Sequence, residues 1–242
     1  MSERKDVQPS GVPVPCLTCD ARSGGVCGTL DAEQLASLAK ASSKKRLESG
    51  AELIGDAQTV EAYSNILSGV VKLTKGLPDG REQIVGLQFA PDFLGRPFQD
   101  ESAITAHAAT NVVLCSFPKR TLEMLIKQSP RLEHFLLNQT LRELDEARDW
   151  MLTLGRKNAL EKVASYLLLI ARYIDPAVDP DSQSIAFDLP MSRLEIADFL
   201  GLTIETVSRQ LTKLRIDGVI AVSQNRHIVV ANPERLRMRS GC

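Results

Sequence analysis

Apolar and polar residues alternate in short runs between residues 42 and 117, which is the period of half-buried β-strands. The runs cover residues 63–67, 70–74, 83–89 and 111–117. Between the second and third runs, Pro78-Asp79-Gly80 has the composition of a tight turn, because proline presets φ and glycine accepts a positive φ. The pattern predicts an antiparallel β-sandwich or β-roll, preceded by a short helix over residues 31–41.

After Pro118 the spacing of apolar residues becomes helical. It predicts a short helix over residues 121–128, a long helix that Pro130 opens and that ends near Gly155, and a further helix over residues 158–174. Steps of three and four along the long helix form a seam of Leu137, Thr140, Leu144, Ala147, Met151 and Leu154. Such a seam is typical of a dimerisation helix. A helix face packed on its own domain gives the same pattern over so short a stretch, and the sequence leaves both interpretations open.

The last fifty residues predict two helices joined by a tight turn. Ser192 can cap a helix that ends at Leu200, Gly201 can take the positive φ of the turn, and Thr203 can cap a second helix that ends near Ile216. Two short strands over residues 218–222 and 227–230 enclose a polar tip. This order predicts a winged helix-turn-helix, with a plain helical hairpin as the alternative.

The exposed first turn of the second helix would enter the major groove of DNA. Arg209 can pair with the O6/N7 edge of guanine, and Glu205 can accept a hydrogen bond from the cytosine amino group. Glu205 could instead be a solvated residue that stabilises the helix N-terminus. The predicted DNA contacts are Thr203, Glu205, Ser208 and Arg209 near the bases, and Lys213, Arg215 and Arg226 at the phosphates.

Composition places the chain among globular proteins, with 43% hydrophobic and 24% charged residues. No apolar run is long enough for a membrane helix, and no secretory signal precedes the first helix, so we expect a cytoplasmic protein without a membrane partner. The formal net charge is −1, but the chain from Thr203 onward has seven basic and three acidic residues. That basic end agrees with a polyanionic partner.

Three of the five cysteines, Cys16, Cys19 and Cys27, lie close together with the spacing C-x2-C-x7-C. In a cytoplasmic chain such a cluster favours a metal or redox site over a disulfide framework. Gly24-Gly25 can take positive φ and let the third thiol fold back. The segment has few apolar residues, so we expect that burial alone does not hold it. The alternative is a flexible arm with incidental thiols.

A fourth thiol would complete the site, and Cys115, on the predicted strand 111–117, ranks above the terminal Cys242. A buried core cysteine is an equally good interpretation of Cys115 taken alone. Four thiolates suit either Zn²⁺ or an iron–sulfur cluster. Three close cysteines and one remote one favour iron–sulfur, without excluding zinc.

The order of these parts resembles the CRP/FNR family of bacterial regulators, and the run Glu205-Thr206-Val207-Ser208-Arg209 resembles the recognition helix of its oxygen-responsive FNR branch. The resemblance covers nearly the whole chain. It implies an α+β fold with a cyclic-nucleotide-binding-like β-roll, a long dimerisation helix and a winged helix-turn-helix. The expected domains are a cysteine-rich arm (1–29), a β-roll sensor domain (30–128), the dimerisation helix (129–156) and the DNA-binding domain (157–242).

The same resemblance implies a [4Fe-4S] cluster held by Cys16, Cys19, Cys27 and Cys115. It also implies a homodimer that activates transcription with RNA polymerase from a two-fold site of half-site TTGAT, read by Glu205, Ser208 and Arg209. Oxygen would attack the cluster, weaken the dimer and release DNA. The seven-residue gap between Cys19 and Cys27 is longer than the five residues typical of the family. A zinc-stabilised or thiol-redox regulator is the alternative.

Two further expectations concern what the chain does not bind or do. No arginine immediately precedes Ser102, and Asp100 and Glu101 would repel a phosphate, so we do not expect a cyclic nucleotide as effector. The three histidines fall on separate predicted elements and form no HxH pair, so we do not expect an enzyme.

Overall fold

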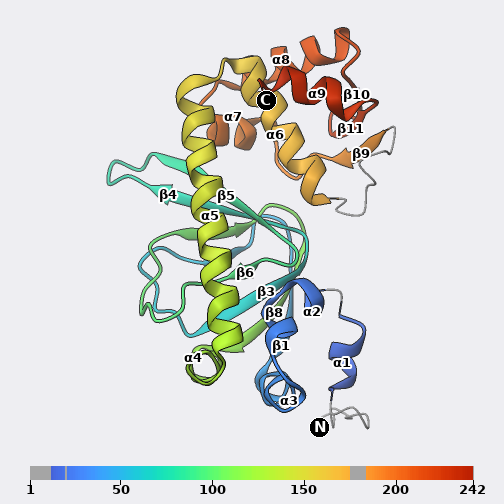
Figure 1. The fold of residues 1–242 in the computed structure, drawn as a ribbon. Helices are drawn as coiled ribbons and strands as arrows, with labels where there is room; N and C mark the ends of the chain where they lie inside the picture. The colour runs from blue at the N-terminus through green and yellow to red at the C-terminus, as the bar shows by residue number, and fades with distance from the viewer. Residues whose placement is uncertain (1–11, 20, 175–183, 242) are drawn as a thin grey trace. The chain divides into compact units, whose positions relative to one another are not determined.

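The computed structural model describes residues 12–19, 21–174 and 184–241 (Figure 1). The chain divides into two compact units: residues 1–75 with 86–144, and residues 76–85 with 145–242. In the described ranges, no helix combines the length and the apolar character needed to cross a membrane.

The first unit contains most of two four-stranded sheets, while Gly76 of one strand and residues 82–85 of the next fall in the second unit. The first sheet has the order β1 (Ser43–Leu47), β8 (Val112–Pro118), β3 (Ala62–Ser68) and β6 (Phe93–Leu94), and its pairs are antiparallel. The second has the order β2 (Glu52–Ile54), β7 (Thr105–Ala108), β4 (Val70–Gly76) and β5 (Glu82–Phe89). The four predicted strands are β3, β4, β5 and β8, and Gly80 in the predicted turn has φ +85°. The expected β-roll is confirmed, with four additional short strands that the alternation did not reveal.

Two apolar layers hold the first unit together. One lies between the sheets and includes Ile66, Val71 and Leu114. The other covers the outer face of the first sheet, where Tyr63 and Phe117 pack with residues of helices α4 (Lys119–Gln128) and α5 (Pro130–Arg156). Because neighbouring residues of a strand point to opposite faces, Tyr63 and Phe117 share this outer face with Asn65 and Cys115.

The cysteine arm consists of α1 (Val14–Leu17), α2 (Ala21–Gly24) and the 3-10 helix η1 (Val26–Thr29), followed by α3 (Ala32–Ala41). Figure 1 shows the arm, in blue, beside β1 and β8. Val26 is fully buried in the outer apolar layer and Ala21 is 4% exposed. Two of its few apolar side chains therefore reach a core that the β-roll provides, and the expectation that burial alone does not hold the segment stays a prediction.

The second unit contains α6 (Ala159–Ile174), β9 (Ile185–Asp188), α7 (Arg193–Leu200), α8 (Ile204–Ile216), β10 (Ile220–Ser223), β11 (His227–Val230) and α9 (Pro233–Arg239). The last residues of α5 also belong to it. Its strands form one sheet in the order β10-β11-β9, and α9 packs on α6. The helix pair and the wing were predicted, whereas β9 and α9 were not.

Local hydrogen bonds define the helix-turn-helix. The Ser192 side chain accepts from the Glu195 backbone N–H, and Glu195 accepts in return from the Ser192 N–H, which makes a capping box for α7. Gly201 ends α7 with φ +60° and ψ +44°, the left-handed region that favours glycine. The Thr203 hydroxyl accepts from the Thr206 N–H at 3.2 Å and caps α8. Ile196, Leu200, Val207 and Leu211 fill the space between the helices.

Candidate cysteine centre and DNA-reading surface

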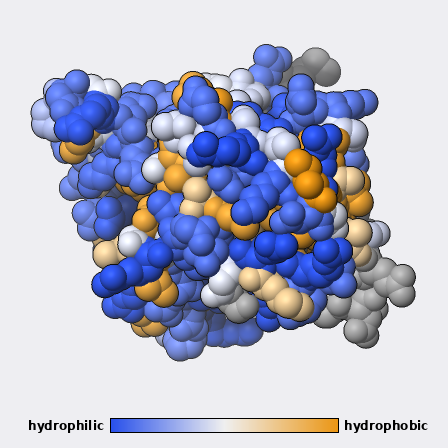
Figure 2. Space-filling view, turned by 90° about the horizontal axis from the view of Figure 1, so that it is seen from above, coloured by the Kyte–Doolittle hydropathy of each residue, from blue (hydrophilic) through white to orange (hydrophobic). Residues whose placement is uncertain are grey.

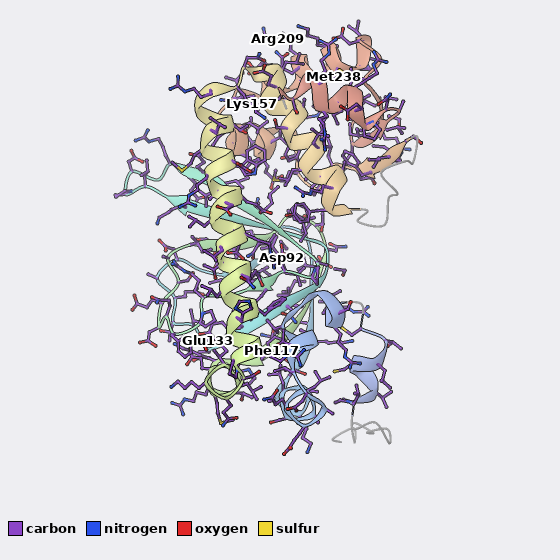
Figure 3. The ribbon with its side chains drawn as sticks, in the orientation of Figure 1. Asp92, Phe117, Glu133, Lys157, Arg209 and Met238 are labelled. Carbon is purple, nitrogen blue, oxygen red and sulfur yellow. The ribbon has the colours of Figure 1, made fainter. Side chains whose placement is uncertain are left out.

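The arm brings its thiols to the outer face of the first sheet. Cys27 and Cys115 are both partly buried and both pack against the apolar layer that contains Val26 and Phe117. Phe117, which is labelled in Figure 3, lies on β8 and packs with residues of α4 and α5. Cys16 and Cys19 are also partly buried. Cys115 is at least 88 residues away from each arm cysteine in the sequence. The fold nevertheless brings it into the same region of the first unit as the three arm cysteines.

Gly24 and Gly25 permit this approach, but not through positive φ. The residues with positive φ do not include either of them, and Gly25 has φ −105°. A Cβ at Gly24 would lie 2.6 Å from Cγ of Pro91, and a Cβ at Gly25 would lie 2.7 Å from the carbonyl oxygen of Ala21. Both glycines are therefore explained by close contact with their surroundings rather than by backbone conformation.

The thiols influence one another electrostatically. Burial raises the pKa of Cys27 to about 12, and the neighbouring thiols of Cys115, Cys16 and Cys19 add to that rise, while Arg22 lowers it. Burial also raises the pKa of Cys115, and the neighbouring Cys16 and Cys19 raise it further. A hydrogen bond with Ser42 and the positive charge of Lys44 lower this pKa and offset part of the rise. Burial therefore disfavours the thiolate forms of Cys27 and Cys115.

The chemistry of this donor set fits a metal that prefers sulfur. The gathered donors are all thiols, and four thiolates suit zinc or an iron–sulfur cluster. As they stand, however, no three or more His, Cys, Asp or Glu side chains among the described residues form a group that could hold a metal ion. Ligation therefore requires the arm thiols to close further on Cys115. The rival fourth ligand, Cys242, lies outside the described residues.

A cavity of about 500 Å³ opens in the first unit, between the β-roll and the first half of α5. Its lining includes Arg96, Glu101, Ser102 and Glu143. Asp100 is not part of the lining, and its carboxylate pairs with Lys119 Nζ at 2.7 Å. Repulsion of a phosphate would therefore come from Glu101 and Glu143 rather than from Asp100. The absence of a cyclic nucleotide remains a prediction.

The predicted seam of α5 is largely exposed in the chain. In the first unit, Leu137 is 54% and Leu144 is 44% exposed, and in the second unit Met151 is 73% exposed. These three side chains do not pack on their own domain. Thr140 and Ala147 are also exposed, whereas Leu154 is half-buried. Leu141 and Leu152 extend the exposed apolar surface beyond the predicted positions.

The first turns of α8 present the predicted base contacts. Glu205 and Arg209 are exposed and Ser208 is half-buried, above a buried layer of Val207, Leu211 and Leu214. Arg209, labelled in Figure 3, donates from Nη2 to the Thr206 hydroxyl at 3.5 Å. This long bond leaves most of the guanidinium donors available.

Glu205 also has a structural role. A hydrogen bond from its own backbone N–H and one from the Thr203 hydroxyl lower its pKa, so its carboxylate is charged and helps to hold the start of α8. A base contact and this helix-end role are compatible, because a carboxylate has several acceptor positions. Thr203 is exposed and caps the same helix.

The predicted phosphate contacts divide into two kinds. Lys213 and Arg215 are exposed on α8. Arg226, at the tip of the wing, donates from Nε to the Leu189 carbonyl oxygen at 2.7 Å, so part of its guanidinium holds the wing. Figure 2, seen from above the view of Figure 1, shows mostly hydrophilic residues with hydrophobic residues among them.

Sequence reasoning missed the polar residues next to the thiols. Asn65, on β3, is 1% exposed and donates from Nδ2 to Cys27 Sγ at 3.7 Å. Ser42 hydrogen-bonds with Cys115, and Lys44 is the register partner of Cys115 on β1. The sequence did contain one signal for Asn65. In the predicted strand 63–67 it lies two residues after Tyr63 and so occupies the same, apolar face.

Comparison with known proteins relates both units to one kind of regulator. Residues 161–239 match the model of the Crp-like helix-turn-helix domain, and residues 44–129 match that of the cyclic nucleotide-binding domain. A probable transcriptional activator of Rhizobium leguminosarum bv. viciae is 53% identical over 96% of both chains. The transcriptional activator protein FnrL of Cereibacter sphaeroides is 40% identical over 93% of this chain and 92% of its own. The crystal structure of FixK2 from Bradyrhizobium japonicum has a TM-score of 0.73 at 31% identity and covers 83% of this chain and 98% of its own.

Proposed function

The chain belongs to the CRP/FNR family of transcription regulators, which are not enzymes, and on that premise we propose that it is an oxygen-responsive activator whose DNA binding requires a [4Fe-4S] cluster. Its ligands are Cys16, Cys19, Cys27 and Cys115. The observation that carries the proposal is that Cys27 of the arm and Cys115 of β8 pack against the same apolar layer on one face of the β-roll. A relative from Shigella dysenteriae, 27% identical over 97% of this chain, is a fumarate and nitrate reduction regulatory protein.

Ligation would tie the arm to the sheet. When bound, the cluster supplies iron that keeps the four sulfurs as thiolates and that oxygen can attack. Cys27 and Cys115 pack on the apolar layer that also contains Leu122, Leu125 and Leu132, the last of these at the start of α5. The arm and the start of α5 therefore pack on the same apolar layer. Loss of ligation would release the arm and so change the packing at the start of α5.

The seam of α5 would then form the dimer interface. Its apolar residues Leu137, Leu144 and Met151 are flanked by Glu143, Asp145, Glu146 and Asp149. These acids repel one another across a two-fold axis, although Arg148 pairs with Asp145 at 3.1 Å and offsets part of the repulsion. A dimer of such marginal stability responds to a small input, because about 1.4 kcal/mol changes an equilibrium tenfold.

Dimerisation couples two recognition helices on one DNA molecule. Each α8 would read a half-site resembling TTGAT through Glu205, Ser208 and Arg209, and a pair of weak half-site contacts becomes one tight contact. Activation at such a site would involve contact with RNA polymerase. No cyclic nucleotide takes part in this proposal.

The decisive experiment is purification without oxygen. We expect a brown protein with iron and acid-labile sulfide in equal amounts, which is dimeric by sedimentation and binds the two-fold site. On exposure to air the colour bleaches and the dimer dissociates at the same protein concentration. A cluster-free protein that stays dimeric and binds DNA equally well would remove the proposed sensing mechanism.

A zinc-stabilised or thiol-redox regulator is the second candidate, because the same four thiols suit zinc. It would be colourless, would contain zinc instead of iron and would bind DNA in air. The same purification therefore separates the two candidates.

A further inference from the structure

Asn65 lies between the two halves of the cysteine centre. On the sheet its register partner across β8 is Cys115. Opposed residues of antiparallel strands share a face, with Cβ atoms about 4.5–5.5 Å apart. From the arm, the Cys27 sulfur accepts a hydrogen bond from Asn65 Nδ2 at 3.7 Å. One side chain of the β-roll therefore contacts an arm thiol and adjoins the sheet thiol.

Packing alone does not account for an amide at this position. Asn65 is 1% exposed, and in the described part of the chain its Oδ1 is buried without a hydrogen-bond partner. A buried acceptor without a partner destabilises the fold, whereas leucine, with the same branching and number of side-chain heavy atoms, would have no such polar atom. An uncompensated buried amide beside two thiols indicates a role toward those thiols.

The arm is fitted closely to this amide. A Cβ at Gly25 would lie 3.1 Å from Asn65 Nδ2 and 3.3 Å from the Pro91 carbonyl oxygen. The backbone of the arm thus covers Asn65 where only glycine fits. Any movement that draws Cys27 toward Cys115 takes place against the Asn65 side chain.

We propose that Asn65 is a positioning residue of the cysteine centre, whose side-chain N–H groups hold the Cys27 thiolate beside Cys115 in the ligated state. The proposal rests on the proposed function. An N–H donor compensates the negative charge of a desolvated thiolate that a metal ligates, and hydrogen bonds to cluster sulfurs influence cluster properties. Changes in such outer residues commonly reduce metal affinity about 10- to 100-fold.

Two variants and one control test it. Asn65→Leu removes the amide and keeps the branching and the number of side-chain heavy atoms, and Asn65→Asp keeps the shape but replaces the donor with an acceptor. Ser64→Ala is the matched control, because Ser64 is buried on the same strand, points to the opposite face and bonds the Ser116 hydroxyl at 2.8 Å. Each protein is reconstituted without oxygen. The measurements are the half-life of the cluster absorbance in air, the Fe–S stretching frequencies and the unfolding temperature of the metal-free chain.

We expect Asn65→Leu to shorten the half-life of the cluster about 10-fold and to shift the Fe–S frequencies, while the metal-free chain unfolds at the same or a higher temperature. If Asn65 had only a structural role, its replacement would lower both the cluster half-life and the unfolding temperature of the metal-free chain. Ser64→Ala should lower the unfolding temperature and leave the cluster half-life within about twofold of the wild-type value. If Asn65→Asp does not fold, Asn65→Leu alone decides the matter.

The outcomes separate this proposal from the one on which it rests. If the wild-type chain holds iron and the Asn65→Leu cluster matches it in half-life and frequencies, only the role of Asn65 is overturned. If the wild-type chain holds zinc, the cluster proposal fails, and zinc transfer to a chelator must then be about 10-fold faster from Asn65→Leu for the role of Asn65 to stand. A wild-type chain that binds neither metal overturns both.

Discussion

The helices of the winged module begin on side-chain caps, supplied by Ser192, Thr203 and Asn232, whereas α1 and η1 of the cysteine arm have no side-chain cap. The arm helices are four residues long, well below the length at which a helix is stable by itself. The capping hydrogen bonds of α7, α8 and α9 join residues of the winged module itself, while the buried Tyr166 hydroxyl of α6 has no partner in the described part of the chain. In the arm region, the thiols are desolvated and Asn65 keeps an unpaired buried oxygen.

Under the proposed function, this difference agrees with an arm that is completed only when its cofactor is bound. The caps and the turn of the helix-turn-helix, by contrast, are formed by residues of the winged module itself. The arm and β8 together place four thiols near one another, but among the described residues they do not form a group that could hold a metal ion. Under the proposed function the cluster would complete this site, so that its loss would change the arm.

The largest expected effect comes from Cys115→Ser. This change removes the only predicted ligand on the sheet, so the arm loses its anchor and the chain should lose nearly all of its cluster iron. Affinity for the two-fold site should fall toward the non-specific level, about 10³-fold or more. Iron analysis and DNA binding at one salt concentration measure both effects. Cys242→Ser serves as control, and if that variant lost iron while Cys115→Ser kept it, the assignment of the fourth ligand would be reversed.

A smaller and purely local effect should follow from Arg209→Ala. Loss of one bidentate base contact costs about 1–3 kcal/mol and relaxes specificity at that base pair, with no change in iron content. Lys213→Ala is the comparison on the same helix, because a phosphate contact carries no sequence information. It should weaken binding to all sequences equally and reduce the salt dependence by about one ion. Equal loss on specific and unrelated DNA for Arg209→Ala would contradict its base-reading role.

The smallest expected effect is that of Ser192→Ala, which removes the capping box of α7. The free energy of unfolding of the winged unit should fall by about 1 kcal/mol, because one orphan N–H loses its acceptor. Thermal unfolding of the metal-free chain measures the change, and Ser223→Ala, at an exposed position of the wing, is the control. Cluster half-life should not change. A large loss of cluster in Ser192→Ala would show that the cysteine centre depends on the stability of the winged module.

The winged module was predictable because its signals are local. Ser192, Gly201 and Thr203 mark the ends of α7 and α8 through bonds that span three or four residues. The same reasoning missed β9, whose four residues become a strand only by pairing with β11, where Phe187 lies opposite Ile228. The pattern of residues 185–188 alone does not indicate that they pair with β11, about forty residues later.

The ligands of the proposed cysteine centre stay a prediction from the sequence, whereas the surroundings of the thiols come from the structure. The spacing of Cys16, Cys19 and Cys27 is visible in the chain, and the choice of Cys115 depended on recognising a strand. That Val26 would be buried, and that Gly25 is needed for close contact with Asn65, depends on strands and helices from elsewhere in the chain. Sequence spacing carries no information about such contacts.

The amino-acid sequence by itself determined the helix caps, the turn glycines, and the order of β-roll, long helix and winged helix-turn-helix. Those features follow from bonds within one turn or from side-chain periodicity. Only the tertiary structure decided that the arm is packed on the outer face of the first sheet, that Asn65 lies between Cys27 and Cys115, and that the seam of α5 stays exposed. Burial and unpaired polar atoms are properties of the assembled chain, because each depends on neighbours that are distant in sequence.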